Sequence, residues 1–219
     1  MNNNIAIDGP AGAGKSTVAK AVAKKLGLIY VDTGAMYRAL GLYLIRNSID
    51  VNDEQAVINC LDKADVTIEY VNNEQVVLLN GENVNGLIRT QEVSEMASAC
   101  SAIALVRKNM VVRQQKLAAE KDVVMDGRDI CEVVLPDART KIFLTASTKV
   151  RAKRRYDELI AKGVQCNLDE IEEDIIKRDD RDMNRAASPL RQTEDATLVD
   201  TSDMTIDEVI DRIVGLANG

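Results

Sequence analysis

The residues with the clearest chemical meaning lie near the start of the chain, in the stretch GPAGAGKST from Gly9 to Thr17. This stretch fits the pattern G-x-x-x-x-G-K-[ST], in which glycines let successive backbone N–H groups face one anion. In that pattern Lys15 reaches the outer phosphates of a nucleotide and the Ser16 hydroxyl holds Mg²⁺. We therefore predict a site for a nucleoside triphosphate. Its expected ligands are Gly9, Pro10, Ala11, Gly12, Ala13, Gly14, Lys15, Ser16 and Thr17.

Arginines at the ends of predicted strands form a second group of candidates. Arg38 follows the second predicted strand, and Arg128 and Asp129 directly follow the third. Ligands of open parallel sheets gather at the carboxyl ends of the strands, and a planar guanidinium binds phosphate oxygens bidentately. These residues are candidates for a second anion site. The alternative is that residues 126–129 form a turn that is stabilised by Asp side chains.

The segment KRDDRDMNRAASPL carries further arginines. If it is helical, Arg178, Asp182 and Arg185 fall at i, i+4 and i+7 on one face, with Arg181 beside them. They belong either to the second anion site or to a solvated, salt-bridged helix face.

Basic residues also open the helix that we expect after the fourth strand: Lys149, Arg151, Lys153, Arg154 and Arg155. Arg151 and Arg155 share a face at i, i+4, and Gly163 is expected to end the helix. One interpretation is a short mobile lid over about residues 149–167, and the other is a solvated helix face.

The composition restricts the available chemistry. The chain of 219 residues has no histidine, which excludes His-based triads, His metal sites and the usual general base. A formal net charge of −7 argues against nonspecific binding to nucleic acid or anionic lipid. No stretch approaches the roughly 18 to 20 apolar residues of a membrane helix, and the initial MNNN lacks the order of a signal peptide. We expect a cytoplasmic protein whose cysteines, Cys60, Cys100, Cys131 and Cys166, are reduced thiols.

The elements that must position these residues alternate between strand and helix. Compact apolar segments predict five parallel strands, at residues 4–8, 28–31, 122–127, 140–146 and 196–202. Helical spacing predicts helices at 15–26, 36–46, 91–99, 103–119 and 205–216. The expected fold is α/β, with a five-stranded parallel sheet flanked by helices.

One interval breaks this alternation, because about ninety residues separate the second and third strands, too many for a plain crossover. Within it, VTIEYV and QVVLLNG flank Asn72-Asn73 and alternate like an antiparallel hairpin. We predict a small antiparallel β insert at residues 64–88, extended by a helix at 90–101. Residues 1–63 and 89–219 would form the core.

Three classes of protein use such a phosphate loop: switch GTPases, motor or nucleic-acid ATPases, and small-molecule kinases. The sequence has no guanine-reading N-K-x-D stretch, and its acidic balance argues against a nucleic-acid ATPase. A nucleotide-dependent binding switch would not explain arginines after two different strands. A kinase with a second anion site is the favoured interpretation.

Several segments together resemble the bacterial cytidylate kinases, in the same order and across nearly the whole chain: IDGPAGAGKST, DTGAMYR, IRTQEV, DGRDI, KIFLTAS and KRDDRDMNRAASPL. The resemblance implies a P-loop nucleoside monophosphate kinase fold, with an insert that binds the monophosphate and a short helical lid. It also implies an enzyme that uses MgATP to convert CMP and dCMP to CDP and dCDP, with UMP a poor acceptor.

The resemblance further assigns residues to the acceptor: Thr33, Arg38, Ser98, Arg107, Arg128, Asp129, Arg178, Asp182 and Arg185. In this assignment Ser98, Arg107 and Asp129 read the cytosine. The chemistry agrees, because cytosine presents an amino donor beside ring acceptors, whereas uracil inverts part of this pattern.

The resemblance places the remaining acceptor residues on the phosphate and the sugar. Arg128 and Arg185 join Arg38 on the acceptor phosphate, and Arg178 and Asp182 hold the sugar. The catalytic residues that it implies are Lys15, Arg128, Arg151, Arg155 and Arg185, with Arg151 and Arg155 closing on the transferring phosphoryl group.

Other acceptors are the main alternatives. Adenylate kinases resemble D-G-F-P-R where this chain has residues 126–129, and shikimate kinases carry D-x-D where it has Asp32-Thr33-Gly34. Both differ from this sequence at those positions. We expect a monomer that binds small nucleotides and neither nucleic acid nor membranes.

Overall fold

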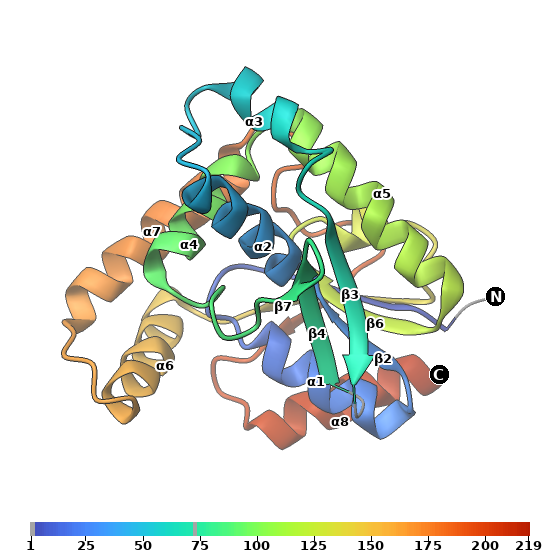
Figure 1. The fold of residues 1–219 in the computed structure, drawn as a ribbon. Coiled ribbons are helices and arrows are strands. Elements are labelled where there is room, and N and C mark those ends of the chain that lie inside the picture. Colours follow the sequence, from blue (N-terminus) through green and yellow to red (C-terminus); the bar gives the residue numbers. More distant parts are fainter. Residues whose placement is uncertain (1–2, 72–73) are drawn as a thin grey trace. The chain divides into compact units, whose positions relative to one another are not determined.

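The computed structural model describes residues 3–71 and 74–219, and its chain divides into two compact units (Figure 1). The first unit comprises residues 1–30 and 122–219, and the second comprises residues 31–121. The second unit contains all of the predicted β insert together with the helices on either side of it.

A five-stranded sheet confirms the predicted fold class. Its strands lie in the order β2 (Ile29–Asp32), β6 (Val123–Gly127), β1 (Ile5–Asp8), β7 (Thr140–Thr145) and β8 (Thr197–Asp200). Strand β1 pairs in parallel with both β6 and β7, so that Asp8 lies opposite Gly127 on one side and Phe143 on the other. The phosphate loop and the segment that begins with Arg128 therefore leave the sheet at the same edge.

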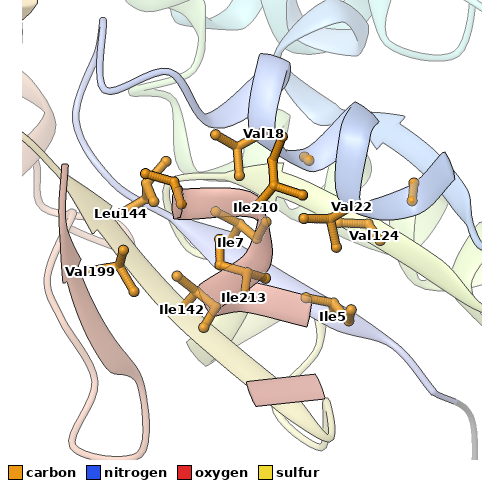
Figure 2. Close-up of a cluster of buried hydrophobic side chains, with 13 residues drawn as sticks. Ile5, Ile7, Val18, Val22, Val124, Ile142, Leu144, Val199, Ile210 and Ile213 are labelled. Atoms are coloured by element: carbon orange, nitrogen blue, oxygen red, sulfur yellow. The ribbon is translucent and has the colours of Figure 1, made fainter. Parts of the chain in front are cut away.

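The core of the first unit lies where helices α1 (Lys15–Leu26) and α8 (Ile206–Asn218) pack on this sheet (Figure 2). Its labelled side chains are Ile5, Ile7, Val18, Val22, Val124, Ile142, Leu144, Val199, Ile210 and Ile213. The branched residues of the strands suit a pleated surface, and Val18 and Val22 fall on one face of α1. This packing fixes both elements that flank the phosphate loop, and it places the last helix on the sheet.

The other helical elements of the first unit are a π-helical turn, η1 (Ile130–Val134), and helices α6 (Thr148–Ala161) and α7 (Leu168–Asn184). Gly163 follows α6 in the left-handed region with φ 74°, as predicted from its position. The sequence did not predict η1, because a single wide turn leaves no periodic pattern.

The second unit contains a three-stranded antiparallel sheet and four helices among its described residues. The strands are β3 (Val66–Val71), β4 (Glu74–Leu79) and β5 (Glu82–Asn83), and the helices are α2 (Thr33–Arg46), α3 (Glu54–Cys60), α4 (Gln91–Cys100) and α5 (Ala104–Glu120). The predicted hairpin is confirmed as β3 and β4, although its predicted turn, Asn72-Asn73, lies outside the described residues. Helix α3 and strand β5 were not predicted.

Helices α2 and α4 approach each other closely in the second unit. A Cβ atom added at Gly41 of α2 would lie 3.1 Å from the backbone nitrogen of Ala97 in α4, so a glycine permits this approach. None of the helices in residues 3–71 and 74–219 has the length and apolar character needed to cross a membrane.

Candidate functional site: a phosphate loop and two groups of arginines

The phosphate loop joins β1 to α1 and depends on glycine at three positions. Gly9, Gly12 and Gly14 have φ values of 150°, 75° and 87°, which other residues rarely adopt. A Cβ atom on Gly9 would also lie only 1.9 Å from the carbonyl oxygen of Leu144 in β7. The backbone of the loop can therefore pass close to the neighbouring strand only where there is no side chain.

Lys15 begins α1 and is folded back onto the loop. Its ammonium group donates to the carbonyl oxygens of Gly9 and Pro10, at 2.7 and 2.8 Å. Burial, together with the positive charges of Arg128 and Arg178, lowers the pKa of Lys15 to about 7, against the opposing effects of Asp126 and Asp8. The lysine is thus a desolvated cation, with two arginines of the predicted acceptor site in its electrostatic surroundings.

The start of α1 is open to an anion. Gly14 occupies the N-cap position and supplies no side chain to the free N–H groups of the first turn, which also contains no acidic residue. The positive end of the helix dipole therefore faces the loop without internal neutralisation.

Asp126, at the end of β6, is a site residue that the sequence did not single out. Its carboxylate accepts hydrogen bonds from the Ser16 hydroxyl at 3.1 Å and from the Tyr30 hydroxyl at 2.9 Å. Ser16 and Asp126 are 110 residues apart in the chain, so only the parallel sheet brings them together. The signal that could have found Asp126 is a carboxylate at the carboxyl end of a buried strand, beside the loop.

Asp8, at the end of β1, orients the segment that contains Asp129. Its two carboxylate oxygens accept the backbone N–H groups of Ile130 and Cys131, at 2.9 and 2.8 Å. Burial raises the pKa of Asp8, although these two backbone hydrogen bonds act in the opposite direction. Asp8 therefore fixes the start of η1 directly after Asp129, which is itself buried.

Arg128, Asp182 and Arg185 come together in the first unit. The Arg128 Nε donates to an Asp182 oxygen at 2.8 Å, and an Arg185 nitrogen lies 3.9 Å from the other Asp182 oxygen. Burial opposes ionisation of Asp182, but Arg128, Arg178 and Arg185 outweigh it and lower the pKa of this carboxyl. Asp182 is thus a buried carboxylate with three arginines in its electrostatic surroundings. It does not lie on a solvated helix face, which was the alternative interpretation.

Helix α7 ends one residue before Arg185, so the predicted helical face through Arg185 is wrong. Arg185 is extended, with φ −64° and ψ 145°, and its Nε donates to the carbonyl oxygen of Ser188 at 2.7 Å. Pro189 disfavours helical backbone at Ser188, whose φ of 49° marks a turn. The turn still returns the Arg185 guanidinium to Asp182, although by a different route from the one predicted.

The two predicted lid arginines of α6 differ sharply in their surroundings. Arg151 is buried, and its guanidinium donates to the carbonyl oxygens of Ala11 and Ala146, each at 2.9 Å, and to Asp179 of α7 at 2.6 Å. Arg155 is partly exposed and pairs with Glu158 at 2.9 Å. Arg151 therefore connects the phosphate loop, the residue that follows β7, and α7, whereas the ion pair of Arg155 lies within its own helix.

Arg154 is a further residue that the sequence did not assign. It donates to the hydroxyl and carbonyl oxygens of Thr201, at 3.0 and 2.8 Å, beyond the end of β8. Its guanidinium is also 4.0 Å from the position that a Cβ atom of Gly14 would occupy. A cation thus lies beside the phosphate loop in the first unit.

In the second unit, Thr33 and Arg38 lie at the start of α2. Asp32 caps the helix by accepting the N–H of Ala35 at 2.9 Å, and its other oxygen accepts from Arg38 at 2.8 Å. Thr33 is buried at the first helical position. Asp32 therefore caps α2, which begins three residues before the predicted start at residue 36.

Ser98 and Arg107, the other predicted acceptor residues of the second unit, lie on α4 and α5. Arg107 is buried, donates to the carbonyl oxygen of Ser101 at 3.1 Å, and lies over the ring of Tyr37, 5.8 Å from its centroid. Ser98 is partly buried, two residues before the end of α4. A guanidinium held at a helix junction by a carbonyl and an aromatic ring is a rigid donor.

The parallel sheet, the glycine loop before α1 and the arginines that follow the strands define a P-loop kinase fold. A family model described as cytidylate kinase matches residues 5–219. A cytidylate kinase of Caldicellulosiruptor saccharolyticus is 50% identical over 213 residues, which cover 97% of this chain and 94% of that protein. The chain belongs to the cytidylate kinase family.

Two further comparisons concern the family and the fold, respectively. A cytidylate kinase of a Geobacillus species, strain WCH70, is 47% identical over 220 residues, which cover 100% of this chain and 98% of that protein. The crystal structure of an uncharacterized protein from Eubacterium ventriosum matches with a TM-score of 0.52, over 98% of each chain. At 14% sequence identity the latter likeness concerns the fold alone.

Proposed function

We propose that this protein transfers a phosphoryl group from ATP to CMP and dCMP, producing CDP and dCDP. The observation that carries the proposal is that one compact unit contains both the phosphate loop, with Lys15 folded onto the carbonyl oxygens of Gly9 and Pro10, and the Arg128–Asp182 pair of the predicted acceptor site. Membership of the cytidylate kinase family over residues 5–219 supports the same reaction. The predicted donor loop and part of the predicted acceptor site thus belong to the same compact unit.

The loop residues 9–17 bind the phosphates of ATP in this proposal. An incoming triphosphate replaces the carbonyl oxygens of Gly9 and Pro10 as the partner of Lys15, and it accepts the free N–H groups at the start of α1. The Lys15 ammonium, which is desolvated here, then gains an anionic partner. This gain favours the charged form of the lysine in the complex.

The residues beside the loop fit a magnesium ion. The Ser16 hydroxyl and the Asp126 carboxylate are hard oxygen donors 3.1 Å apart, and Mg²⁺ prefers one or two such groups together with substrate phosphates. Ser16 and Asp126 would hold the ion, Asp126 directly or through water. When bound, Mg²⁺ supplies charge neutralisation between the outer phosphates of the donor.

The acceptor phosphate is bound by Arg38, Arg128 and Arg185, and the sugar by Arg178 and Asp182. Asp182 is ionised, because its three arginine neighbours lower the pKa of its carboxyl, and it can therefore accept hydrogen bonds from sugar hydroxyls. The same carboxylate holds Arg128 in place before the phosphate arrives. The acceptor site is preorganised to that extent.

The base is read by Ser98, Arg107 and Asp129, with Thr33 beside the acceptor. Asp129 and Ser98 accept from the amino group of cytosine, and Arg107 donates to its ring acceptors. Uracil leaves part of this set unpaired, at a cost of about 1 to 3 kcal/mol per buried group. This cost favours CMP over UMP.

Catalysis rests on position and charge. The attacking oxygen of the acceptor phosphate is already anionic, so the reaction needs no general base, in agreement with a chain that has no histidine. Lys15, Arg128 and Arg185 stabilise the charge that spreads over the transferring group. Arg151 and Arg155 are proposed to complete this shell, Arg155 after leaving Glu158.

We further propose that the enzyme acts as a cytoplasmic monomer on free nucleotides, without nucleic acid. The net charge of −7 supports the last point, because a polyanion would be repelled outside the local arginine groups.

A coupled assay of ADP release tests the proposed function with CMP, dCMP, UMP, AMP and shikimate as acceptors. We expect turnover with CMP and dCMP, slower turnover with UMP, and none above background ATP hydrolysis with AMP or shikimate. Absence of turnover with CMP would overturn the proposal, and preference for another acceptor would assign the chain a different substrate.

A further inference from the structure

Two arginines of the second unit share one carboxylate. Asp32 Oδ2 accepts from Arg38 at 2.8 Å and lies 3.6 Å from a guanidinium nitrogen of Arg89. Two further hydrogen bonds hold Asp32 in place. Its Oδ1 accepts the N–H of Ala35, and its own backbone N–H donates to the side chain of Gln75 at 2.7 Å. The carboxylate is nearly buried, whereas the Arg89 side chain is 67% exposed.

Asp32 and the acceptor phosphate compete for the guanidinium of Arg38 if Arg38 binds that phosphate. In this structure the Nη2 atom of Arg38 donates to Asp32. Its Nε is buried and has no hydrogen-bond partner in the part of the chain that the structure describes. A phosphate that engages Arg38 weakens the Arg38–Asp32 pair. It also brings a second anion toward a nearly buried carboxylate, which would repel it.

Arg89 is placed to replace Arg38 as the partner of Asp32. It lies against the same Asp32 oxygen as Arg38, but it is exposed and therefore free to tighten from 3.6 Å to a full hydrogen bond. Helix α4 begins two residues later and is capped by Thr90, so the Arg89 backbone is tied to a stable element while its side chain can move.

We propose that Arg89 is a positioning residue for acceptor binding: it keeps Asp32 neutralised when Arg38 turns to the acceptor phosphate. The proposal rests on the proposed function for the identity of the acceptor. Arg89 acts through Asp32 and not by contact with the nucleotide. Its contribution is therefore specific to ligands that carry a phosphate, and it depends on the negative charge of Asp32.

A double-mutant cycle on Arg89 and Asp32 tests the proposal. Arg89→Ala should raise the KM for CMP about fivefold with little change in kcat, in line with the loss of one charge-assisted contact near the surface. Asp32→Asn keeps a side chain that caps helices equally well and removes the charge. In the Asp32→Asn background, Arg89→Ala should change the KM less than about twofold, because Arg89 then has no charge to neutralise; uncoupled sites would instead show the same loss of about fivefold in both backgrounds.

The controls separate this role from a structural one. Arg46→Ala removes a surface arginine of the same unit that pairs with Glu82 at 2.6 Å, and it should leave the KM for CMP unchanged. Arg89→Lys should restore most of the affinity. Binding of cytidine, measured by calorimetry, should be the same in wild type and Arg89→Ala, since cytidine has no phosphate for Asp32 to repel.

Three results would overturn the inference: an unchanged KM for CMP in Arg89→Ala, an equal loss in the Asp32→Asn background, or an equal loss of cytidine binding. The second result would indicate that Arg89 touches the nucleotide itself. Failure of the proposed function has a different signature, since wild-type protein would then not phosphorylate CMP at all.

Discussion

The ammonium group of Lys15 in the phosphate loop should titrate near neutral pH, where its protonation can be measured. Burial, with the nearby charges of Arg128 and Arg178, lowers the pKa of Lys15 to about 7, so the free protein loses this charge as the pH rises through 7. A bound triphosphate favours the charged lysine and raises its pKa again. The binding of ATP near pH 8 must then take up a proton, and affinity falls by up to about tenfold per pH unit above 7.

Calorimetry at pH 8 in two buffers of different ionisation enthalpy checks this prediction. We expect net proton uptake in wild type when ATP binds without acceptor, and none in Lys15→Met, which should also lose most of its kcat. Equal proton uptake in both proteins would assign the titration to another group.

Asp129 is the residue whose replacement should most directly change base selection. It is buried two residues after the end of β6, and the segment after it is held by Asp8. Asp129→Ala should reduce the ratio of kcat/KM for CMP over UMP by about tenfold, because an unpaired amino group costs 1 to 3 kcal/mol. Asp129→Asn, which keeps one carbonyl acceptor, should retain part of the preference. An unchanged ratio in Asp129→Ala would remove this residue from the base-reading set.

At the scale of elements, α6 carries two arginines that the sequence treated alike and the structure separates. Arg151→Ala removes the ion-pair partner of Asp179, whose carboxylate is nearly buried. It also removes the hydrogen bond to the carbonyl oxygen of Ala11 in the loop. We expect a loss of unfolding free energy of about 3 kcal/mol. Arg155→Ala breaks a surface pair within one helix and should change this free energy by less than about 1 kcal/mol.

Urea unfolding of both variants, together with their kcat values, distinguishes a residue that stabilises the fold (an anchor) from one that closes on the substrate. If Arg155 closes on the phosphoryl group, Arg155→Ala should lower kcat at unchanged stability. The assignment of Arg151 as an anchor fails if both variants unfold at the same urea concentration as wild type.

Local pattern was sufficient for most elements, whereas the partners of two carboxylates depended on long-range contact. The phosphate loop, its helix and the five strands could be predicted because glycine spacing and apolar runs act over a few residues. The end of α7 was predicted wrongly although its signal is local, since Pro189 disfavours helical backbone at Ser188 and Arg185 bonds to Ser188 only three residues away. The carboxylates Asp8 and Asp126 were missed for a different reason. Their partners are set by strand order, which the spacing of a single sequence does not reveal.

At the scale of the whole molecule, the predicted acceptor residues are distributed over both compact units. Arg38, Ser98 and Arg107 belong to residues 31–121, whereas the loop, Arg128 and Asp182 belong to the other unit. ATP, bound by the loop, should therefore slow amide hydrogen exchange mainly in the first unit. CMP should slow it in both units.

Hydrogen exchange measured by mass spectrometry can follow both units in one experiment. With saturating CMP we expect protection at the start of α2 and the end of α4 in the second unit, and around residues 127–131 and 178–185 in the first. A ligand at one hundred times its dissociation constant stabilises by about 2.7 kcal/mol, enough to slow exchange that requires opening of the bound state about a hundredfold. Arg38→Ala, which removes a residue proposed to bind the acceptor phosphate, should weaken the protection by CMP at the start of α2. Protection by CMP confined to the first unit would contradict the assignment of Arg38, Ser98 and Arg107 to the acceptor, while leaving the phosphate loop as the site of ATP.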